Sequence, residues 1–172
     1  TVYTCDEVTA LCATAHELGL RVHMDGARLA NAAAALGLPL RAFTRDAGVD
    51  ILSFGATKNG AMGAEAVVVF DPALAEGMLF LRKQSMQLAS KMRYVSAQFL
   101  ALAESDLWRT NARNSNAMAQ RLAAGVRAIP ELELIGEAGF MVAFRSQQVD
   151  VYRVRDELGK RGWNLNGPHR PA

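Results

Sequence analysis

The chain has 172 residues, of which 51% are hydrophobic and 21% are charged, and its formal net charge is +2 at pH 7. This composition is typical of a soluble globular protein and excludes a disordered chain. The small net charge and the scattered lysines and arginines argue against a nucleic-acid partner. No apolar run approaches the roughly 20 residues that span a bilayer, so we also expect no membrane partner.

Two cysteines, Cys5 and Cys12, fall in one predicted helix and form no CxxC motif. Two thiols in a reducing compartment are a better interpretation than a disulfide or a metal site, and we expect a cytoplasmic protein without a metal. The sequence begins at Thr1, without an initiator methionine and in the middle of an alternating pattern. One interpretation is therefore that the chain is a fragment.

The first predicted helix covers residues 6–18. Thr4 with Glu7 three residues later has the pattern of a capping box, and Gly19 is the residue type that commonly ends a helix. Apolar residues at helical spacing predict a buried stripe. The members of this stripe are Val8, Leu11, Cys12, Ala15 and Leu18. His16 lies in the same helix, where we expect a structural role.

Short apolar strands follow, alternating with helices. The strands are predicted at residues 20–24, 49–54 and 66–70, and the helices at 30–36 and 41–47. The last strand, AVVVF, is apolar enough to be buried on both faces. Helix alternating with apolar strand predicts an α/β fold with a largely parallel sheet.

From residue 71 onward the pattern is more helical and then becomes α+β. We expect a helix at 73–81 that continues over 82–102, and another that begins after Ser105 or Asp106 and ends near residue 128. The remaining elements are strands at 132–135, 140–144 and 162–165 and a helix at 152–160. The predicted organisation is one large-domain portion (1–80), a connecting helical region (81–104) and a small, partial α+β domain (105–172).

Asp25 and Lys58 each follow a predicted strand, and ligands of such sheets bind beyond the carboxyl ends of the strands. Lys58 is either a solvated surface charge or, because small apolar residues flank it, a partly desolvated amine suited to Schiff-base chemistry. Asp25 is either the N-cap of the next helix or a carboxylate that holds a protonated ring nitrogen. Arg28 could bind a phenolate or a substrate carboxylate.

These motifs together resemble the low-specificity L-threonine aldolases, which are pyridoxal-phosphate enzymes of the aspartate-aminotransferase-like fold, fold type I. The resemblance covers about residues 1–130. It rests on HMDGAR at 23–28, NA at 31–32, TKNG at 57–60, RKQ at 82–84, QLASKMR at 87–93, NAMA at 116–119 and RLA at 121–123. It implies the C-terminal part of such an enzyme, with a parallel-rich sheet followed by a small α+β domain.

The resemblance also implies roles for individual residues around pyridoxal 5′-phosphate. Lys58 would be the catalytic residue that carries the cofactor, and Asp25 would pair with its pyridine nitrogen. Arg28 would lie near the phenolic oxygen and bind the substrate carboxylate. Thr57 would either touch the cofactor phosphate or only shape the turn, and His23 would support the site rather than act as an acid or base.

Arg93 matches an arginine that helps to bind the cofactor phosphate across a subunit interface, and Lys91 is a weaker candidate. A solvated helix face is the alternative for both residues. The resemblance implies a homo-oligomer, a dimer-based tetramer, whose substrate is a small amino acid. The implied reaction splits a β-hydroxy-α-amino acid such as L-threonine or L-allo-threonine into glycine and an aldehyde. The base that removes the hydroxyl proton is not identified by these residues.

Two departures from this family pattern leave alternatives open. The N-terminal half of the family's enzymes carries a phosphate-binding turn and a histidine that stacks on the cofactor ring. We find no counterpart of that half in this sequence. Residues 139–170 look more like the C-terminal domain of sphingosine-phosphate-lyase-like enzymes. Arg170 is only a weak candidate for the late arginine that binds the substrate carboxylate in the aldolases. His169 is interpreted as an exposed residue of the tail. For this tail the alternatives are a divergent member, a joined sequence, or chance similarity within a shared α+β fold. For the function they are another reaction of the same cofactor fold, such as a phosphoalkylamine lyase, a decarboxylase or β-elimination, and an inactive truncated chain.

Overall fold

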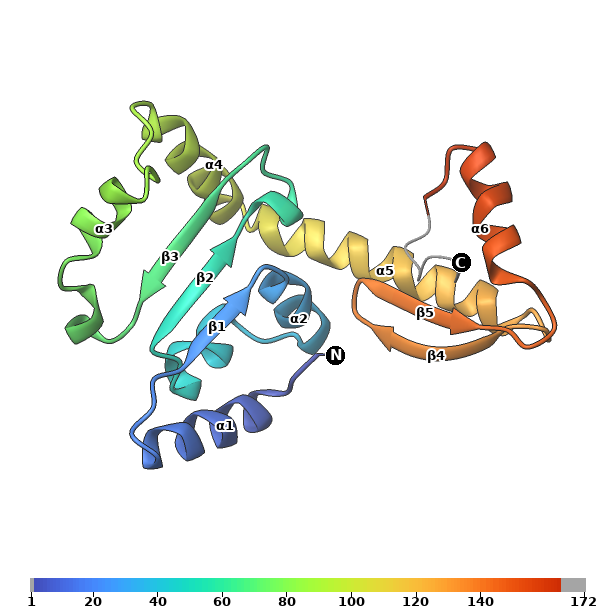
Figure 1. Cartoon of the computed structure of the whole chain (residues 1–172), viewed down its shortest axis with the longest axis horizontal. Helices are drawn as coiled ribbons and strands as arrows, with labels where there is room; N and C mark the ends of the chain where they lie inside the picture. The colour runs from blue at the N-terminus through green and yellow to red at the C-terminus, as the bar shows by residue number, and fades with distance from the viewer. Residues whose placement is uncertain (1, 165–172) are drawn as a thin grey trace. The chain divides into compact units, whose positions relative to one another are not determined.

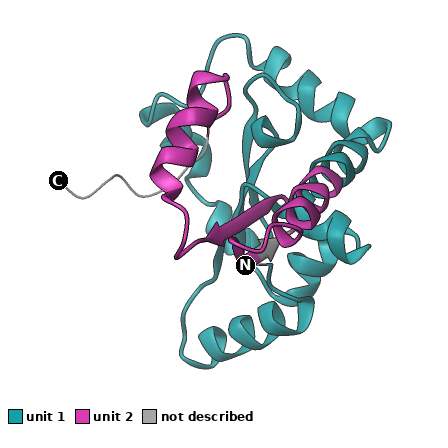
Figure 2. Cartoon of the chain, turned by 90° about the vertical axis from the view of Figure 1, so that its right-hand side faces the viewer, with its two compact units in different colours: residues 1–116 teal, residues 117–172 magenta. Residues whose placement is uncertain are grey.

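The computed structural model describes residues 2–164, apart from the side chains of residues 137 and 138. The chain forms two compact units, residues 1–116 and residues 117–172 (Figure 2). Helix α5 (Leu107–Arg127) begins in the first unit and continues into the second. Within the described residues, no helix is both long enough and apolar enough to cross a membrane.

The first unit contains a three-stranded sheet with the strand order β1-β2-β3 (Figure 1). Strands β1 and β2 pair in parallel, whereas β3 runs antiparallel to β2. The elements in chain order are α1 (Cys5–Glu17), β1 (His23–Gly26), α2 (Leu29–Leu36), β2 (Ile51–Gly55), β3 (Glu65–Val69), α3 (Met78–Gln84) and α4 (Met92–Glu104). Short 3-10 helices cover Leu40–Phe43, Arg45–Ala47, Thr57–Asn59 and Pro72–Ala75.

The α/β sheet that the sequence predicts is present, with its parallel pairing at β1 and β2. Strand β3 returns antiparallel because the connection from Ala56 to Ala64 is shorter than the roughly dozen residues of a parallel crossover. The prediction that β3 is buried on both faces is wrong. Val67 is 57% exposed and Glu65 is exposed on the same face, so this part of one face of β3 is open to solvent.

Helix α1 begins as predicted, because Thr4 and Glu7 form the complete capping box. The Thr4 Oγ1 accepts the Glu7 N–H at 3.3 Å, and the Thr4 N–H donates to the Glu7 carboxylate at 2.7 Å. The predicted buried stripe is too wide: Val8 and Cys12 are buried, but Leu11 and Leu18 are more than half exposed. At 3.6 residues per turn these leucines lie at one edge of the stripe, beside the contact with the core.

The core of the first unit consists of three clusters. The first joins α1 to the chain before β2, the second surrounds α2 and β2, and the third lies beneath the loop after β2. Their buried members are, in turn, Val8, Cys12, Ala47 and Val49; Leu29, Ala33, Phe43 and Leu52; and Ala56, Ala64 and Leu102. Both cysteines are free thiols whose pKa is raised mainly by burial, as expected of unreactive structural cysteines.

The helix predicted over 73–102 is interrupted. It divides into the 3-10 helix and α3 and α4, with residues 85–91 outside both α-helices. Met86 has a φ of 55°, a left-handed conformation that ends a right-handed helix. The N–H groups of Met86 and Gln87 bond back to the last turn of α3.

The second unit contains the end of α5, the antiparallel hairpin β4 (Glu133–Ala138) and β5 (Met141–Arg145), and α6 (Val151–Lys160). The two predicted strands and the helix are thus present. The strand predicted at 162–165 is wrong for residues 162–164, and Leu165 lies outside the described residues. The N–H groups of Gly162 and Trp163 instead bond to the carbonyls of Gly159 and Leu158, which closes α6.

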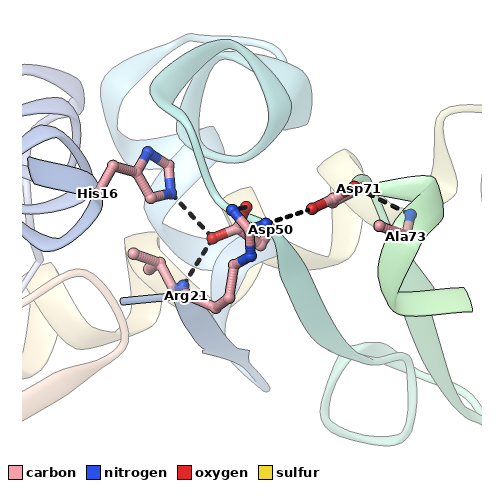
Figure 3. A network of polar contacts seen from close by, with 6 residues as sticks. His16, Arg21, Asp50, Asp71 and Ala73 are labelled. Carbon is pink, nitrogen blue, oxygen red and sulfur yellow. Dashed lines mark hydrogen bonds and ion pairs between the residues drawn. The ribbon is translucent and has the colours of Figure 1, made fainter. Parts of the chain in front are cut away.

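A buried carboxylate connects α1 to the residues just before β1, and Arg21 links it to Asp71 after β3 (Figure 3). The side chain of Asp50 is 9% exposed, and its Oδ2 accepts the Val22 N–H at 2.7 Å and lies 2.9 Å from His16 Nε2. Arg21 reaches this carboxylate at 3.9 Å and Asp71 at 3.3 Å. The structural role expected of His16 is therefore a contact with Asp50, and the hydrogen bonds from Val22 and His16 hold the pKa of Asp50 below its usual range.

Replacement of this carboxylate should destabilise the first unit. Asp50→Ala leaves the Val22 N–H and His16 without their acceptor, so we expect the free energy of unfolding to fall by roughly 2–3 kcal/mol. Asp46→Ala is the matched control, because Asp46 forms an exposed ion pair with Arg41 at 2.8 Å. Urea unfolding followed by circular dichroism should give a much smaller loss for the control. Equal losses would contradict the role of Asp50.

The same carboxylate should make stability depend on pH. Because the pKa of Asp50 is lower in the folded than in the unfolded chain, its contribution is present above the unfolded pKa and is lost as the pH falls through the folded pKa. The stability difference between the wild type and Asp50→Asn should therefore be full at about pH 7 and shrink below about pH 4. A difference that stays constant in urea titrations down to about pH 3 would rule this linkage out.

Candidate active site

The parallel pair β1 and β2 brings two of the predicted site segments to one edge of the sheet. Asp25 lies opposite Ser53 in the strand register, and Gly26 lies opposite Phe54. Since the strands are parallel, their carboxyl ends meet at the same edge, where β2 continues into the turn with Lys58. Asp25 is inside β1 rather than after it. The strand starts only at His23, because the Leu20 N–H still bonds to Ala15 at the end of α1.

The carboxylate of Asp25 is exposed and closes the turn that follows β1. Its Oδ1 accepts the Ala27 N–H at 3.0 Å. The interpretation of Asp25 as a helix N-cap is wrong, because α2 begins at Leu29 and its N-cap residue is Arg28. The carboxylate thus orders the backbone before the helix and keeps its other oxygen available to a donor. Arg28 itself is half-buried.

His23 lies on the same strand face as Asp25, as the sequence predicts. Between them, Met24 packs into the core, while both flanking side chains are exposed. The His23 Nε2 lies 2.8 Å from the Ser53 Oγ on the neighbouring strand. This contact was not foreseen from the sequence, where Ser53 was only a flanking polar residue.

Lys58 occupies the 3-10 turn Thr57–Asn59, directly after β2. Its side chain is exposed, so the predicted partial desolvation by its neighbours is wrong in this structure. The small apolar residues around it point elsewhere: Ala56 and Ala64 are 2% and 1% exposed and pack against Leu102. The primary amine of Lys58 is therefore accessible to solvent, while the loop that carries it packs on the core through Ala56 and Ala64.

The loop that carries Lys58 is closed on itself by hydrogen bonds. Thr57 Oγ1 accepts the Ala64 N–H at 3.0 Å and donates to the Ala64 carbonyl at 3.4 Å. The Ala56 N–H donates to the same carbonyl at 2.9 Å. In this structure Thr57 thus shapes the turn, which is one of the two roles predicted for it. The contact with a phosphate stays a prediction.

Two further basic candidates lie at the start of α4. Lys91 precedes the helix and Arg93 is its second residue, and both are exposed. The Arg93 guanidinium carbon stacks 4.7 Å from the centre of the Tyr94 ring. This arrangement agrees with a solvated helix face, and a contact with a phosphate stays a prediction. Arg170 and His169 lie outside the described residues.

Three buried asparagines, Asn31, Asn59 and Asn116, lie in the motifs at 31–32, 57–60 and 116–119, but the sequence predicts no role for them. Asn59, next to Lys58, donates to the Trp108 carbonyl and accepts from Asn111, and Asn31 in α2 pairs with Asn116. The signal available in the sequence was the presence of these asparagines in the family motifs close to Lys58 and Arg28. A partner 49 to 85 positions away cannot be identified from such adjacency.

The second unit has a surface hollow of about 530 Å³ along α6. Its lining consists of residues of α6, of the loop before it and of Arg161 after it, and none of them is a predicted site residue. Among the described residues, no group of histidine, cysteine, aspartate and glutamate side chains could hold a metal ion.

Comparison with curated proteins relates the chain to aldolases. It is 47% identical over 134 residues to the low specificity L-threonine aldolase of Pseudomonas sp. (strain NCIMB 10558), covering 78% of the chain and 39% of that protein. The enzyme of the same name from Pseudomonas aeruginosa is 44% identical over 168 residues, covering 96% of the chain and 47% of that enzyme. The chain thus spans less than half the length of these relatives. A sphingosine-1-phosphate lyase of Arabidopsis thaliana is 43% identical over only 53 residues, 30% of the chain and 10% of that lyase.

Solved structures give the same two relationships. The threonine aldolase of Leishmania major superposes with a TM-score of 0.73 at 32% identity, covering 80% of the chain and 40% of that structure. The sphingosine-1-phosphate lyase of Burkholderia pseudomallei has a TM-score of 0.71 at 27% identity, over 95% of the chain and 41% of that structure. The predicted fold class is confirmed. The family model for beta-eliminating lyases matches residues 1–139, and the chain therefore belongs to the beta-eliminating lyase family.

Proposed function

We propose that the protein containing this chain cleaves L-threonine and related β-hydroxy-α-amino acids to glycine and an aldehyde. The observation that carries the proposal is the parallel pairing of β1 and β2, which brings Asp25 and the Lys58 turn to one edge of a sheet. The 44–47% identity to low specificity L-threonine aldolases supports this choice of reaction.

Pyridoxal 5′-phosphate is the cofactor that membership of this family implies, and the enzyme class is a lyase that depends on it. The donor set at the sheet edge fits this group. Lys58 supplies an exposed amine for the cofactor aldehyde, and the exposed carboxylate of Asp25 suits a protonated ring nitrogen. When bound, the cofactor supplies an electron sink for the charge released as a bond at the substrate Cα breaks.

Each residue has a separate task in this proposal. The Lys58 amine would hold the cofactor until the substrate amine binds in its place. The Asp25 carboxylate keeps a proton on the ring nitrogen, and its backbone contact with Ala27 orients it. Arg28 binds the substrate carboxylate, and His23 with Ser53 supports the strand face beside Asp25.

The remaining expectations from the resemblance belong to the same proposal. Arg93 contributes to phosphate binding at a subunit interface, and the protein is a homo-oligomer, a dimer-based tetramer. Large apolar side chains on and after α3 support association, since Leu79, Phe80 and Met86 are 76%, 76% and 90% exposed. A cytoplasmic location agrees with the two free thiols. The domain limits 1–80, 81–104 and 105–172 also stay a proposal.

A second candidate function is cleavage of a phosphorylated alkylamine. The local identity to a sphingosine-1-phosphate lyase and the TM-score of 0.71 to another favour it. The aldolase is preferred because its sequence match extends over 96% of the chain instead of 30%. The cofactor and the roles of Lys58 and Asp25 are the same in both candidates.

Cofactor capture by Lys58 can be tested without catalysis. The purified chain is incubated with pyridoxal phosphate, reduced with borohydride and digested, and the labelled peptides are identified by mass spectrometry. We expect the label at Lys58 to exceed that at Lys83 by roughly tenfold or more, because Lys58 lies in a hydrogen-bonded turn at the same sheet edge as Asp25, whereas Lys83 is an exposed residue of α3. Lys58→Ala should abolish the main label, and Lys83→Ala should preserve it. Equal labelling of the two lysines would refute the assignment of Lys58.

The choice of substrate is tested by aldehyde release. With pyridoxal phosphate present, we expect aldehyde from L-threonine and none from Lys58→Ala, because no other residue replaces its amine. Release from a phosphoalkylamine but not from L-threonine would select the second candidate. If Lys58 is labelled and neither substrate is cleaved, the chain is inactive by itself, which is the truncated-chain alternative.

A further inference from the structure

The first half of α5 hydrogen-bonds to both segments that carry candidate site residues. One of these segments is the turn with Lys58, which α5 contacts through Asn59. The other is the start of α2, directly after Arg28, which α5 contacts through Asn31. Three of the five buried polar residues among the described residues are asparagines of these contacts.

At the Lys58 turn the two hydrogen bonds run in opposite directions. Asn59 Nδ2 donates to the Trp108 carbonyl at 3.0 Å, and Asn111 Nδ2 donates to the Asn59 carbonyl at 2.9 Å. Asn59 is 8% exposed, so water does not readily replace these partners. Gly60 permits the close approach: its φ is +107°, and a Cβ there would lie 2.6 Å from Asn111 Nδ2.

At α2, Asn31 and Asn116 each donate one hydrogen bond to the other. Asn31 Nδ2 donates to Asn116 Oδ1 at 3.0 Å, and Asn116 Nδ2 donates to the Asn31 carbonyl at 3.0 Å. Both residues are more than 90% buried. Because Asn111 and Asn116 belong to one helix, their separation along its axis is held at about 7.5 Å.

We propose that Asn111 and Asn116 are positioning residues that hold the Lys58 turn and the segment after Arg28 at a constant separation. The inference rests on the proposed function and adds to it the part of the chain that sets the geometry of the site. Apolar contacts alone would hold α5 against the sheet without a defined register, since they are not directional. Hydrogen bonds of the short asparagine side chains, donated in both directions, specify which residues of α5 face the Lys58 turn and α2.

The experiment removes one donor and keeps the shape of the side chain. Asn111→Asp replaces the Nδ2 donor with an oxygen that repels the Asn59 carbonyl, and Asn114→Asp is the matched control. Asn114 is exposed on the same helix three positions later, so both variants add the same charge to α5. Backbone hydrogen exchange of residues 57–61 is measured by mass spectrometry, together with pyridoxal-phosphate labelling of Lys58 and Lys83.

We expect exchange at residues 57–61 to accelerate roughly two- to tenfold in Asn111→Asp, the effect of one lost hydrogen bond. Labelling of Lys58 should fall by a similar factor while labelling of Lys83 stays unchanged, and Asn114→Asp should behave like the wild type. A purely structural role would accelerate exchange throughout the first unit and leave the ratio of the two labels unaltered, which would overturn the proposal.

Two outcomes separate this inference from the proposed function. If the wild type does not label Lys58 preferentially, the proposed function fails, whereas local acceleration in Asn111→Asp would still support the contact between α5 and the turn. If the wild type labels Lys58 but Asn111→Asp changes neither readout, the positioning role is refuted alone. Should Asn111→Asp not fold, Asn111→Ser, whose hydroxyl is too short to reach the Asn59 carbonyl, is judged by the same two readouts.

Discussion

The parallel pairing of β1 with β2 is the interaction on which the candidate site depends. It aligns Asp25 with Ser53 and directs both chain segments toward the same edge of the sheet. An antiparallel pair would send the turn with Lys58 to the opposite end of β1. Parallel strands require a long crossover, and here α2 and two 3-10 helices between Gly26 and Ile51 supply it.

Polar groups in the interior determine where the helices sit against this sheet. Asp50 accepts from the first residue before β1 and from α1, so one carboxylate sets two elements against β2. The asparagines of α2, α5 and the Lys58 turn do the same for the elements around the other end of β2. An unpaired buried amide or carboxylate is costly, so each such group tolerates only a narrow set of arrangements.

The family relationship narrows the chemistry more strongly than the geometry does. An exposed amine and an exposed carboxylate at a sheet edge could serve several reactions of the same cofactor. The sequence match to a threonine aldolase extends over 96% of the chain, whereas the match to a sphingosine-1-phosphate lyase extends over 30%. This difference favours aldol cleavage as the proposed reaction. Both residues proposed to hold the cofactor, Asp25 and Lys58, are exposed to solvent.

Local patterns in the sequence sufficed to predict most of the helices and strands, the capping box at Thr4 and the motifs with Asp25, Arg28 and Lys58, but not the turn that closes α6 or the break after α3. These features depend on neighbouring residues, whose periodicity and hydrogen-bonding are visible in a short stretch of chain. The tertiary structure alone decided the antiparallel return of β3, the exposure of Lys58 and Leu11, and the break between α3 and α4. It also decided the partners of Asn59, Asn31 and Asp50, which lie 28 to 85 positions away. Such contacts arise from the packing of whole elements, and a local sequence pattern does not specify which distant residues will cover a side chain.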